Sequence, residues 1–226
     1  MFTSELCLQN KFIQLKEAEL NKNEKILTEF NARFGNVDMV QVFINDSNLL
    51  SYDQANLLST YQFAKVLAFL HKKAIRTFTY LQKCTDYGEK TLSSILSKLI
   101  KANIVTEINS NRYIISEEFE FPMLQFISYE AKLQKWKKAI LQASINKKFS
   151  SYSYVVLPIE LAYKLKENKI NYFQTYNVGL IGVSDNKIEY LFNPKKETLK
   201  FTINPSLISS IAKYQIETST FSISAQ

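Results

Sequence analysis

The sequence is poor in the residues that build several common kinds of site. Its 226 residues include four glycines, two cysteines and a single histidine, His71. One histidine gives no prospect of a Ser-His-Asp triad, and no glycine-rich loop follows a predicted strand as a phosphate-binding loop requires. Cys7 and Cys84 lie far apart and fit no zinc-ligand spacing, so we interpret them as small buried side chains in a reducing cytoplasm. Most chemistry that depends on histidine, cysteine or glycine is therefore excluded.

Long apolar runs are also missing. No window approaches 18 consecutive apolar residues, which argues against a membrane-spanning helix. Residues 1–20 carry acids and glutamines where a signal peptide would have an apolar stretch. The composition, with 46% hydrophobic and 22% charged residues, is that of an ordinary globular protein. We therefore expect a cytoplasmic protein without membrane contact, folded as one large domain or two small ones.

The positive charge is concentrated in one segment. The formal net charge is +7, and between Lys65 and Arg112 there are nine bases against three acids. A locally basic module is the electrostatic footprint of a nucleic-acid-binding surface. The alternative is a solvated face in a lysine-rich protein, and composition does not separate the two.

The spacing of apolar residues predicts an α/β chain in which one helical module interrupts a mixed sheet. The expected helices are 4–20 (with Ser4 as N-cap), 53–73, 76–84, 89–102, 134–148, 160–167 and 205–214. The expected strands are 25–34 and 37–44 (joined by a turn at Gly35-Asn36), 104–107, 112–115, one that begins at Pro122 and carries Glu130 and Lys132, 152–157, 178–183 and 187–192. The tail after Ile216, rich in serine and threonine, is expected to be loose.

The basic segment has the element order helix, turn, helix and hairpin. The run TFTYLQKCTDYGEKTLSSILSKLIKANIVTEINSNRYIIS resembles the winged helix-turn-helix family across its length. The polar face of its last helix suits a DNA groove and its phosphates. The residues predicted to contact double-stranded DNA are Lys90, Thr91, Ser94, Lys98, Lys101 and Arg112. A winged helix that makes protein contacts alone is the other interpretation.

Glu130 and Lys132 stand two apart in an apolar stretch. The period of two in a strand predicts that both side chains lie on one face of the sheet. A carboxylate and an ammonium on a buried strand are costly unless they serve each other or a metal ion. Carboxylates and lysine are the candidates that remain for chemistry, and carboxylates are ligands for a hard cation such as Mg²⁺.

Two stretches together resemble the core of the PD-(D/E)xK nucleases, which have a restriction-endonuclease-like fold. They are GNVDMVQV at residues 35–42 and SYEAKLQKWKKAILQASINKKFSSYSYVVLP at residues 128–158. The resemblance implies a mixed sheet flanked by helices, built from residues 1–46 and 119–226, with the winged helix of residues 47–118 inserted between the two halves.

The same resemblance implies a site. It matches Asp38, Glu130, Lys132 and Gln142 to the family's catalytic residues, and Glu5 to an acid that some members add to the metal site. Asp38, Glu130 and the main-chain carbonyl of Ala131 would then bind Mg²⁺ (or Mn²⁺). Lys132 would orient or deprotonate the attacking water, and Gln142 would position Lys132 or touch the DNA backbone. The implied activity is metal-dependent cleavage of phosphodiester bonds in DNA, with a homodimer if both strands are cut.

The chain departs from the family pattern in two places. Asn146 stands where some members have a tyrosine four residues after the helix glutamine, and Met123 follows Pro122 where Pro-Asp is expected before Glu-x-Lys. The alternative functions are a non-catalytic DNA-binding regulator and an assembly protein, each on a nuclease-like core that has lost activity.

Overall fold

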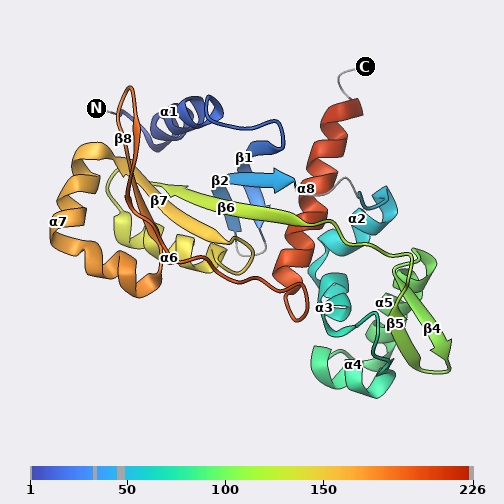
Figure 1. The fold of residues 1–226 in the computed structure, drawn as a ribbon. Coiled ribbons are helices and arrows are strands. Elements are labelled where there is room, and N and C mark those ends of the chain that lie inside the picture. The colour runs from blue at the N-terminus through green and yellow to red at the C-terminus, as the bar shows by residue number, and fades with distance from the viewer. Residues whose placement is uncertain (1, 33–34, 45–48, 224–226) are drawn as a thin grey trace. The chain divides into compact units, whose positions relative to one another are not determined.

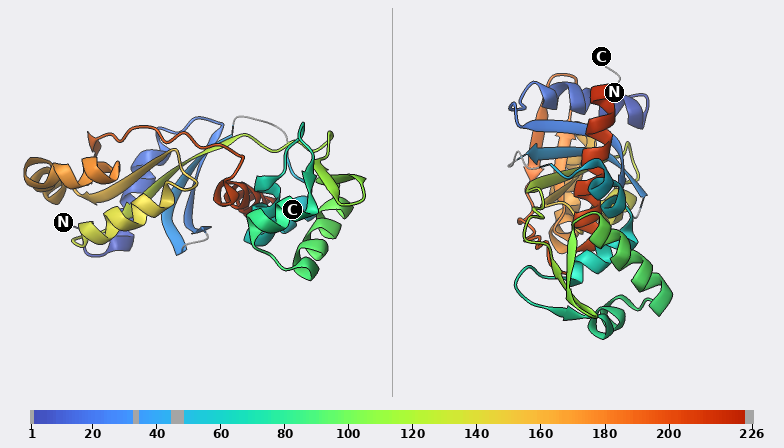
Figure 2. Two further views of the ribbon diagram at one scale, coloured as in Figure 1. Left: turned by 90° about the horizontal axis from the view of Figure 1, so that it is seen from below. Right: turned by 90° about the vertical axis from the view of Figure 1, so that its right-hand side faces the viewer.

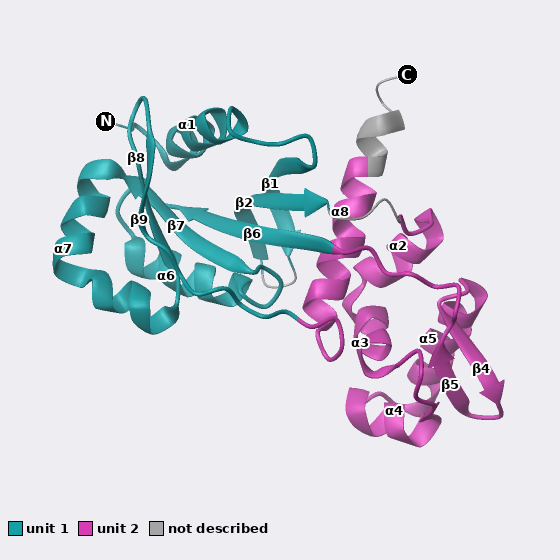
Figure 3. Ribbon diagram, in the orientation of Figure 1, with its two compact units in different colours: residues 1–45, 124–199 teal, residues 46–123, 200–226 magenta. Residues whose placement is uncertain are grey.

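The computed structural model describes residues 2–32, 35–44 and 49–223, with the side chains of residues 219–223 excepted. The chain folds into two compact units (Figure 3). Unit 1 comprises residues 1–45 and 124–199, and unit 2 comprises residues 46–123 and 200–226. The chain leaves unit 1 after the second strand and returns to it at residue 124, a path that the colours trace in Figures 1 and 2.

Unit 1 is a six-stranded sheet with helices against it. Its elements in chain order are α1 (Glu5–Glu17), β1 (Glu24–Ala32), β2 (Gly35–Ile44), β6 (Leu124–Ala131), α6 (Trp136–Asn146), β7 (Tyr152–Pro158), α7 (Ile159–Tyr176), β8 (Gly179–Val183) and β9 (Ile188–Phe192). The strand order is β1-β2-β6-β7-β8-β9. The pairs β6–β7 and β7–β8 are parallel and the other three are antiparallel, so the sheet is mixed.

The two faces of this sheet are covered by different helices (Figure 1). Leu8 and Phe12 of α1 share a buried cluster with Tyr129 and Ala131 of β6. Val155 of β7, which points to the other face of the sheet, clusters instead with residues of α6 and α7. Because successive strand residues point to opposite faces, α1 covers one face and the pair α6 and α7 covers the other. The fold is therefore α/β, and the predicted mixed sheet flanked by helices is present.

Unit 2 combines helices with a small sheet. Its elements are α2 (Tyr52–Ser59), α3 (Tyr61–Phe69), β3 (Arg76–Thr77), α4 (Phe78–Thr85), α5 (Glu89–Lys101), β4 (Val105–Asn109), β5 (Arg112–Ile115) and α8 (Pro205–Ile223). The three strands form an antiparallel sheet in the order β3-β5-β4. Helix α5 is strongly amphipathic: its leucines 92, 96 and 99 and Ile95 are buried, and its serine and lysine face is exposed.

Helix boundaries in unit 2 differ from the sequence prediction. The helix expected over 53–73 is two helices, because Thr60 adopts an extended backbone and ends α2 while it begins α3. A β-branched threonine is less costly in that conformation than inside a helix, and Ser51 already caps α2 with a capping box. The second helix ends at Phe69, so His71 lies outside it.

The segment after residue 199 also differs from the prediction. Residues 200–226 were expected to complete the core of residues 119–226, but they belong to unit 2. There Ile208 and Ala212 of α8 share the buried cluster that contains Leu58 and Leu67. Helix α8 continues to Ile223, beyond the point at which we expected a loose tail.

The cysteines are less buried than we expected. Cys7 is exposed on α1, and Cys84 of α4 is half-buried. On α1 the buried positions are Leu8, Gln9 and Phe12, so Cys7 falls beside the stripe that packs against the sheet. Neither thiol is therefore a core side chain.

The N-cap of α1 and the two strands of the first hairpin follow the prediction, but the predicted turn residues do not. Ser4 caps α1 by accepting the N–H of Cys7 at 3.1 Å, as expected. Gly35 and Asn36, predicted as a turn, already belong to β2, and the connecting residues 33–34 lie outside the described part of the chain.

Among the described residues, no helix is both long and apolar enough to cross a membrane.

Candidate active site

Asp38 lies where β2 and β6 stop pairing. The antiparallel register of these strands ends at Met39 and Tyr129, and one step further Asp38 faces Glu130. Its carboxylate does not point into solvent: Oδ2 accepts the backbone N–H of Ala131 at 2.8 Å. The side chain therefore replaces a missing ladder hydrogen bond and fixes the carboxylate against the end of β6.

Lys132 contacts three other groups of this site. It follows the last residue of β6, and its Nζ donates to Asp38 Oδ2 at 3.1 Å and to the carbonyl of Ala131 at 2.7 Å. The same ammonium lies 3.3 Å from Glu5 Oε2 of α1. Burial lowers the pKa of Lys132, but the carboxylates of Asp38 and Glu5 raise it by more, so the net shift is upward. Lys132 is therefore protonated at neutral pH.

Glu130 is the most unusual carboxylate in the described part of the chain. It is 1% exposed, and Asn146 of α6 donates to its Oε1 at 2.8 Å. Its Oε2 is buried and has no hydrogen-bond partner among the described residues. Desolvation and the charge of Asp38 raise the pKa of Glu130 to about 7, although Asn146 and Lys132 act against that shift. A buried carboxylate oxygen without a donor is costly unless a cation serves it.

The predicted residues thus converge in part. Asp38, Lys132, Glu5 and the carbonyl of Ala131 are joined by direct contacts, and Glu130 is adjacent in the register. The expectation that Glu130 and Lys132 share one face does not describe their contacts, since Glu130 meets α6 while Lys132 meets α1. The reason is that β6 ends at Ala131, so the period of two does not continue through Lys132.

Gln142 does not take the place expected of it. Its Oε1 is buried and accepts no hydrogen bond in the described part of the chain, and the contacts of Lys132 come from other residues. One turn later on α6, Asn146 makes the contact with the site. Sequence reasoning noted Asn146 as a departure from the family pattern and missed its role. The signal available was a polar residue on the buried stripe of an amphipathic helix.

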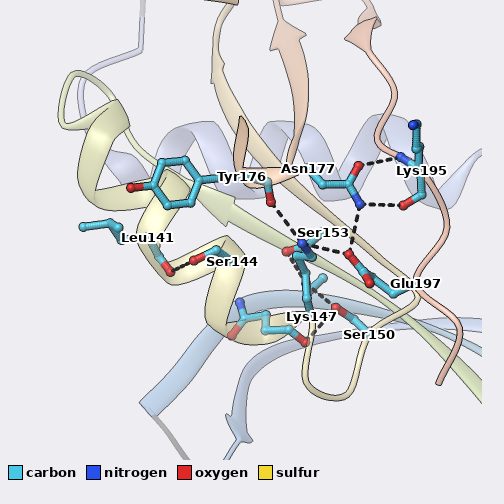
Figure 4. Close-up of polar contacts among 11 residues, drawn as sticks. Leu141, Ser144, Lys147, Ser150, Ser153, Tyr176, Asn177, Lys195 and Glu197 are labelled. Carbon is cyan, nitrogen blue, oxygen red and sulfur yellow. Dashed lines mark hydrogen bonds and ion pairs between the residues drawn. The ribbon is translucent and has the colours of Figure 1, made fainter. Parts of the chain in front are cut away.

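A chain of buried hydroxyls holds the end of α6 in place (Figure 4). Ser150 donates to the carbonyl of Asn146 at 2.9 Å, and Ser128 bridges Ser150 and Ser153 at 2.9 and 2.7 Å. Next to Asn146, Lys147 forms an ion pair with Glu197 at 2.7 Å. These contacts fix the main chain at the end of α6, from which the Asn146 amide reaches Glu130.

Glu29 is a further carboxylate near the site that sequence reasoning missed. The β1–β2 register pairs Thr28 with Met39 and Phe30 with Val37, so Glu29 faces Asp38 without forming a regular pair. Its φ of 51° is in the left-handed region, which is uncommon for a residue other than glycine. Its charge contributes to the raised pKa of Glu130. Glu29 therefore adds negative potential to the site.

The donor set suits a cation that keeps most of its water. The described residues contain no group of three or more Asp, Glu, His or Cys side chains placed to hold a metal ion together. Mg²⁺, however, is commonly bound by one or two carboxylates, with water and phosphate oxygens as the other ligands. Asp38, Glu130 with its unpartnered Oε2, and the Ala131 carbonyl are oxygen donors of that kind. In the type of donor, the residues present therefore suit Mg²⁺ or Mn²⁺.

The predicted DNA-contacting residues of unit 2 are all exposed. Lys90, Thr91, Ser94, Lys98 and Lys101 are exposed on α5. Arg112 is exposed at the start of β5, next to the tip of the hairpin.

Comparison of the chain with protein-family models, with curated proteins and with solved structures finds no match.

Proposed function

We propose that this protein is a Mg²⁺-dependent DNA endonuclease whose unit 2 binds duplex DNA. The observation that carries the proposal is the convergence of Asp38 and Lys132 at the end of β6, next to a buried Glu130 oxygen that lacks a partner among the described residues. Stability alone does not explain such a set, because a buried carboxylate oxygen without a donor is unfavourable. The connectivity α1-β1-β2-β6-α6-β7, with β6 parallel to β7, agrees with a restriction-endonuclease-like core.

Each residue has a role that its contacts support. Asp38 and Glu130, with the carbonyl of Ala131, would hold the cation. When bound there, Mg²⁺ would polarise the scissile phosphate and lower the pKa of a bound water. Lys132 is protonated, so it would orient the water and stabilise negative charge on the phosphate by donating hydrogen bonds, and would not remove a proton. Asn146 would hold Glu130 so that Oε2 remains available.

Unit 2 supports the nucleic-acid part of the proposal. Its order α3-β3-α4-α5-β4-β5, with the sheet order β3-β5-β4, agrees with a winged helix in which α5 is the recognition helix. The exposed side of α5 has three lysines against one acid, Glu89. We infer that this face contacts the phosphates and grooves of double-stranded DNA.

The test is a plasmid-nicking assay with and without Mg²⁺. The wild type should nick in a metal-dependent way, and Asp38→Ala and Lys132→Ala should not, while both still shift DNA on a gel. Lys25→Ala is the matched control, since it removes an exposed lysine from β1 of the same unit. Nicking by both site variants at the wild-type rate would show that the site is assigned wrongly.

One observation favours a second function, a DNA-binding regulator or assembly protein on an inactive core. Lys132 already contacts Asp38, Glu5 and the Ala131 carbonyl at the same time, so its ammonium balances these carboxylates without a metal ion. A regulator of this kind would bind duplex DNA and would not nick it at any Mg²⁺ concentration, and an assembly protein would have no affinity for DNA. Mg²⁺ would also leave its thermal unfolding temperature unchanged.

A further inference from the structure

The helix that follows the candidate site has an unusual charge distribution. From Lys132 to Lys148 the sequence contains six lysines and no aspartate or glutamate. Residues 46–123 of unit 2, in contrast, contain nine bases and eight acids, which nearly balance. A dense run of positive charge therefore lies on α6 and its flanks, beside the candidate active site.

Three of these lysines are available to a ligand. Lys135, Lys137 and Lys138 are exposed, and in the described part of the chain none of them has an ion-pair partner. They lie at the first turn of α6, where positive charge opposes the helix dipole. Helix stability therefore does not explain them, and a departure from such a local rule is expected at a functional surface.

Aromatic rings stand among these lysines. Trp136 of α6 and Tyr172 of α7 make an edge contact, with ring centroids 5.4 Å apart. The Lys137 ammonium lies 5.5 Å from the centroid of the Trp136 ring and 5.7 Å from that of Tyr172. Tyr172 is 43% exposed although it is a large ring. Lysine and aromatic side chains thus form one surface, shared by two helices on the same face of the sheet.

We propose that this surface binds a single-stranded stretch of DNA leading into the candidate site. Unpaired bases stack on exposed aromatic rings, and lysines neutralise the phosphates between them. A duplex keeps its bases stacked inside, so it cannot use the exposed ring of Tyr172 in this way. Charge complementarity and the exposed ring of Tyr172 select this occupant over an apolar protein segment, which would gain nothing from lysines that lack an ion-pair partner.

The chain connection ties the surface to the site. Lys135 is three positions after Lys132, so their Cα atoms are at most about 11 Å apart. The start of this surface is therefore near the main chain of the candidate site, and a strand held on α6 would lead from there toward Asp38 and Glu130. In describing that strand as the substrate, the inference rests on the proposed function, but the binding surface itself does not depend on cleavage. The implied substrate is DNA with a single-stranded branch, gap or end.

The test is the binding of fluorescent 30-nucleotide DNA, single-stranded or duplex, to the full chain in EDTA. Tyr172→Leu keeps the apolar bulk and removes the ring, so it should weaken single-strand binding about tenfold and leave duplex binding unchanged. Tyr172→Phe keeps the ring and should bind as the wild type does. Lys137→Ala/Lys138→Ala should weaken single-strand binding, and its salt dependence should fall by about 0.7 for each phosphate that the protein no longer neutralises.

The control removes two exposed lysines elsewhere in unit 1, by Lys22→Ala/Lys25→Ala. It should leave single-strand binding within about twofold of the wild type. The inference is wrong if Tyr172→Leu binds single strands normally, if it loses duplex and single-strand binding equally, or if the control weakens binding as much as Lys137→Ala/Lys138→Ala. If Tyr172→Leu selectively loses single-strand binding but the wild type never nicks DNA, the proposed nuclease function is wrong and the inference about this surface is still supported.

Discussion

The ammonium of Lys132 lies 3.1 Å from Asp38 Oδ2, although the two residues are 94 positions apart in the sequence. Both side chains are largely buried, at 10% and 15% exposure. Removing one partner of a buried ion pair leaves the other charge without compensation, which is more damaging than removing both. The contact therefore contributes to the fold of unit 1 as well as to the candidate site.

A double-mutant cycle on this pair should reveal strong coupling. Lys132→Met should lower the free energy of unfolding by about 3–5 kcal/mol, because Asp38 and Glu5 then lose their cation. Adding Asp38→Asn should recover part of that loss, with a coupling energy of about 1–3 kcal/mol. Urea unfolding followed by the fluorescence of Trp136, the one tryptophan in the chain, measures both values. Strictly additive effects of the two changes would show that the ion pair does not form in solution.

The stability of unit 1 should fall as the pH rises toward neutrality. Glu130 has a pKa of about 7 in the folded chain, above its ordinary value of 4.5, chiefly because it is desolvated. A raised carboxyl pKa means that the folded state binds the proton more tightly. The stabilising effect of this bound proton is therefore complete below about pH 4.5, and it is lost as the pH rises through about 7. The shift corresponds to a loss on the order of 3 kcal/mol.

Glu130→Gln is the direct check of this pH dependence, measured by Trp136 fluorescence in EDTA. The amide cannot ionise, so the variant should be more stable than the wild type at pH 8 and similar to it at pH 5. Mg²⁺ should raise the unfolding temperature of the wild type at pH 8 and leave that of the variant unchanged. Equal pH profiles for the two proteins would show that Glu130 does not titrate in this range.

Local patterns in the sequence predict some of these features and cannot predict others. The existence of the strand that carries Glu130 and of the amphipathic α5 follows from apolar periodicity, which a sequence displays directly, but the end of that strand at Ala131 does not. The contact of Asn146 with Glu130 depends instead on the packing of α6 against β6, which no local pattern encodes. The same holds for α8: its apolar stripe is visible in the sequence, but the unit that buries it is not. What could not be predicted is the pairing of segments that are far apart in the chain.

Asn146→Ala should weaken metal binding without unfolding unit 1. The substitution removes the donor that holds Glu130 Oε1, so the carboxylate is free to turn and its pKa should rise further. Loss of an outer hydrogen bond to a ligand typically lowers metal affinity about 10- to 100-fold. The measurement is the Mg²⁺ concentration that produces half of the thermal stabilisation. Ser144→Ala is the control on the same helix, since the Ser144 hydroxyl donates to the Leu141 carbonyl within α6, and a shift of equal size there would contradict the role given to Asn146.

If α5 binds duplex DNA, the salt dependence of the affinity should give the number of phosphates that its lysines neutralise. Lys90 and Lys101 are exposed on α5, and the slope of log affinity against log salt should fall by about 0.9 for each phosphate that is no longer neutralised. Lys90→Ala/Lys101→Ala should therefore reduce the slope by about 1.8 and weaken binding to every duplex sequence alike. Lys72→Ala/Lys73→Ala removes the same charge from another part of unit 2 and should change the slope by less than half as much. If the two pairs change it equally, the affinity comes from net charge and not from contacts made by α5.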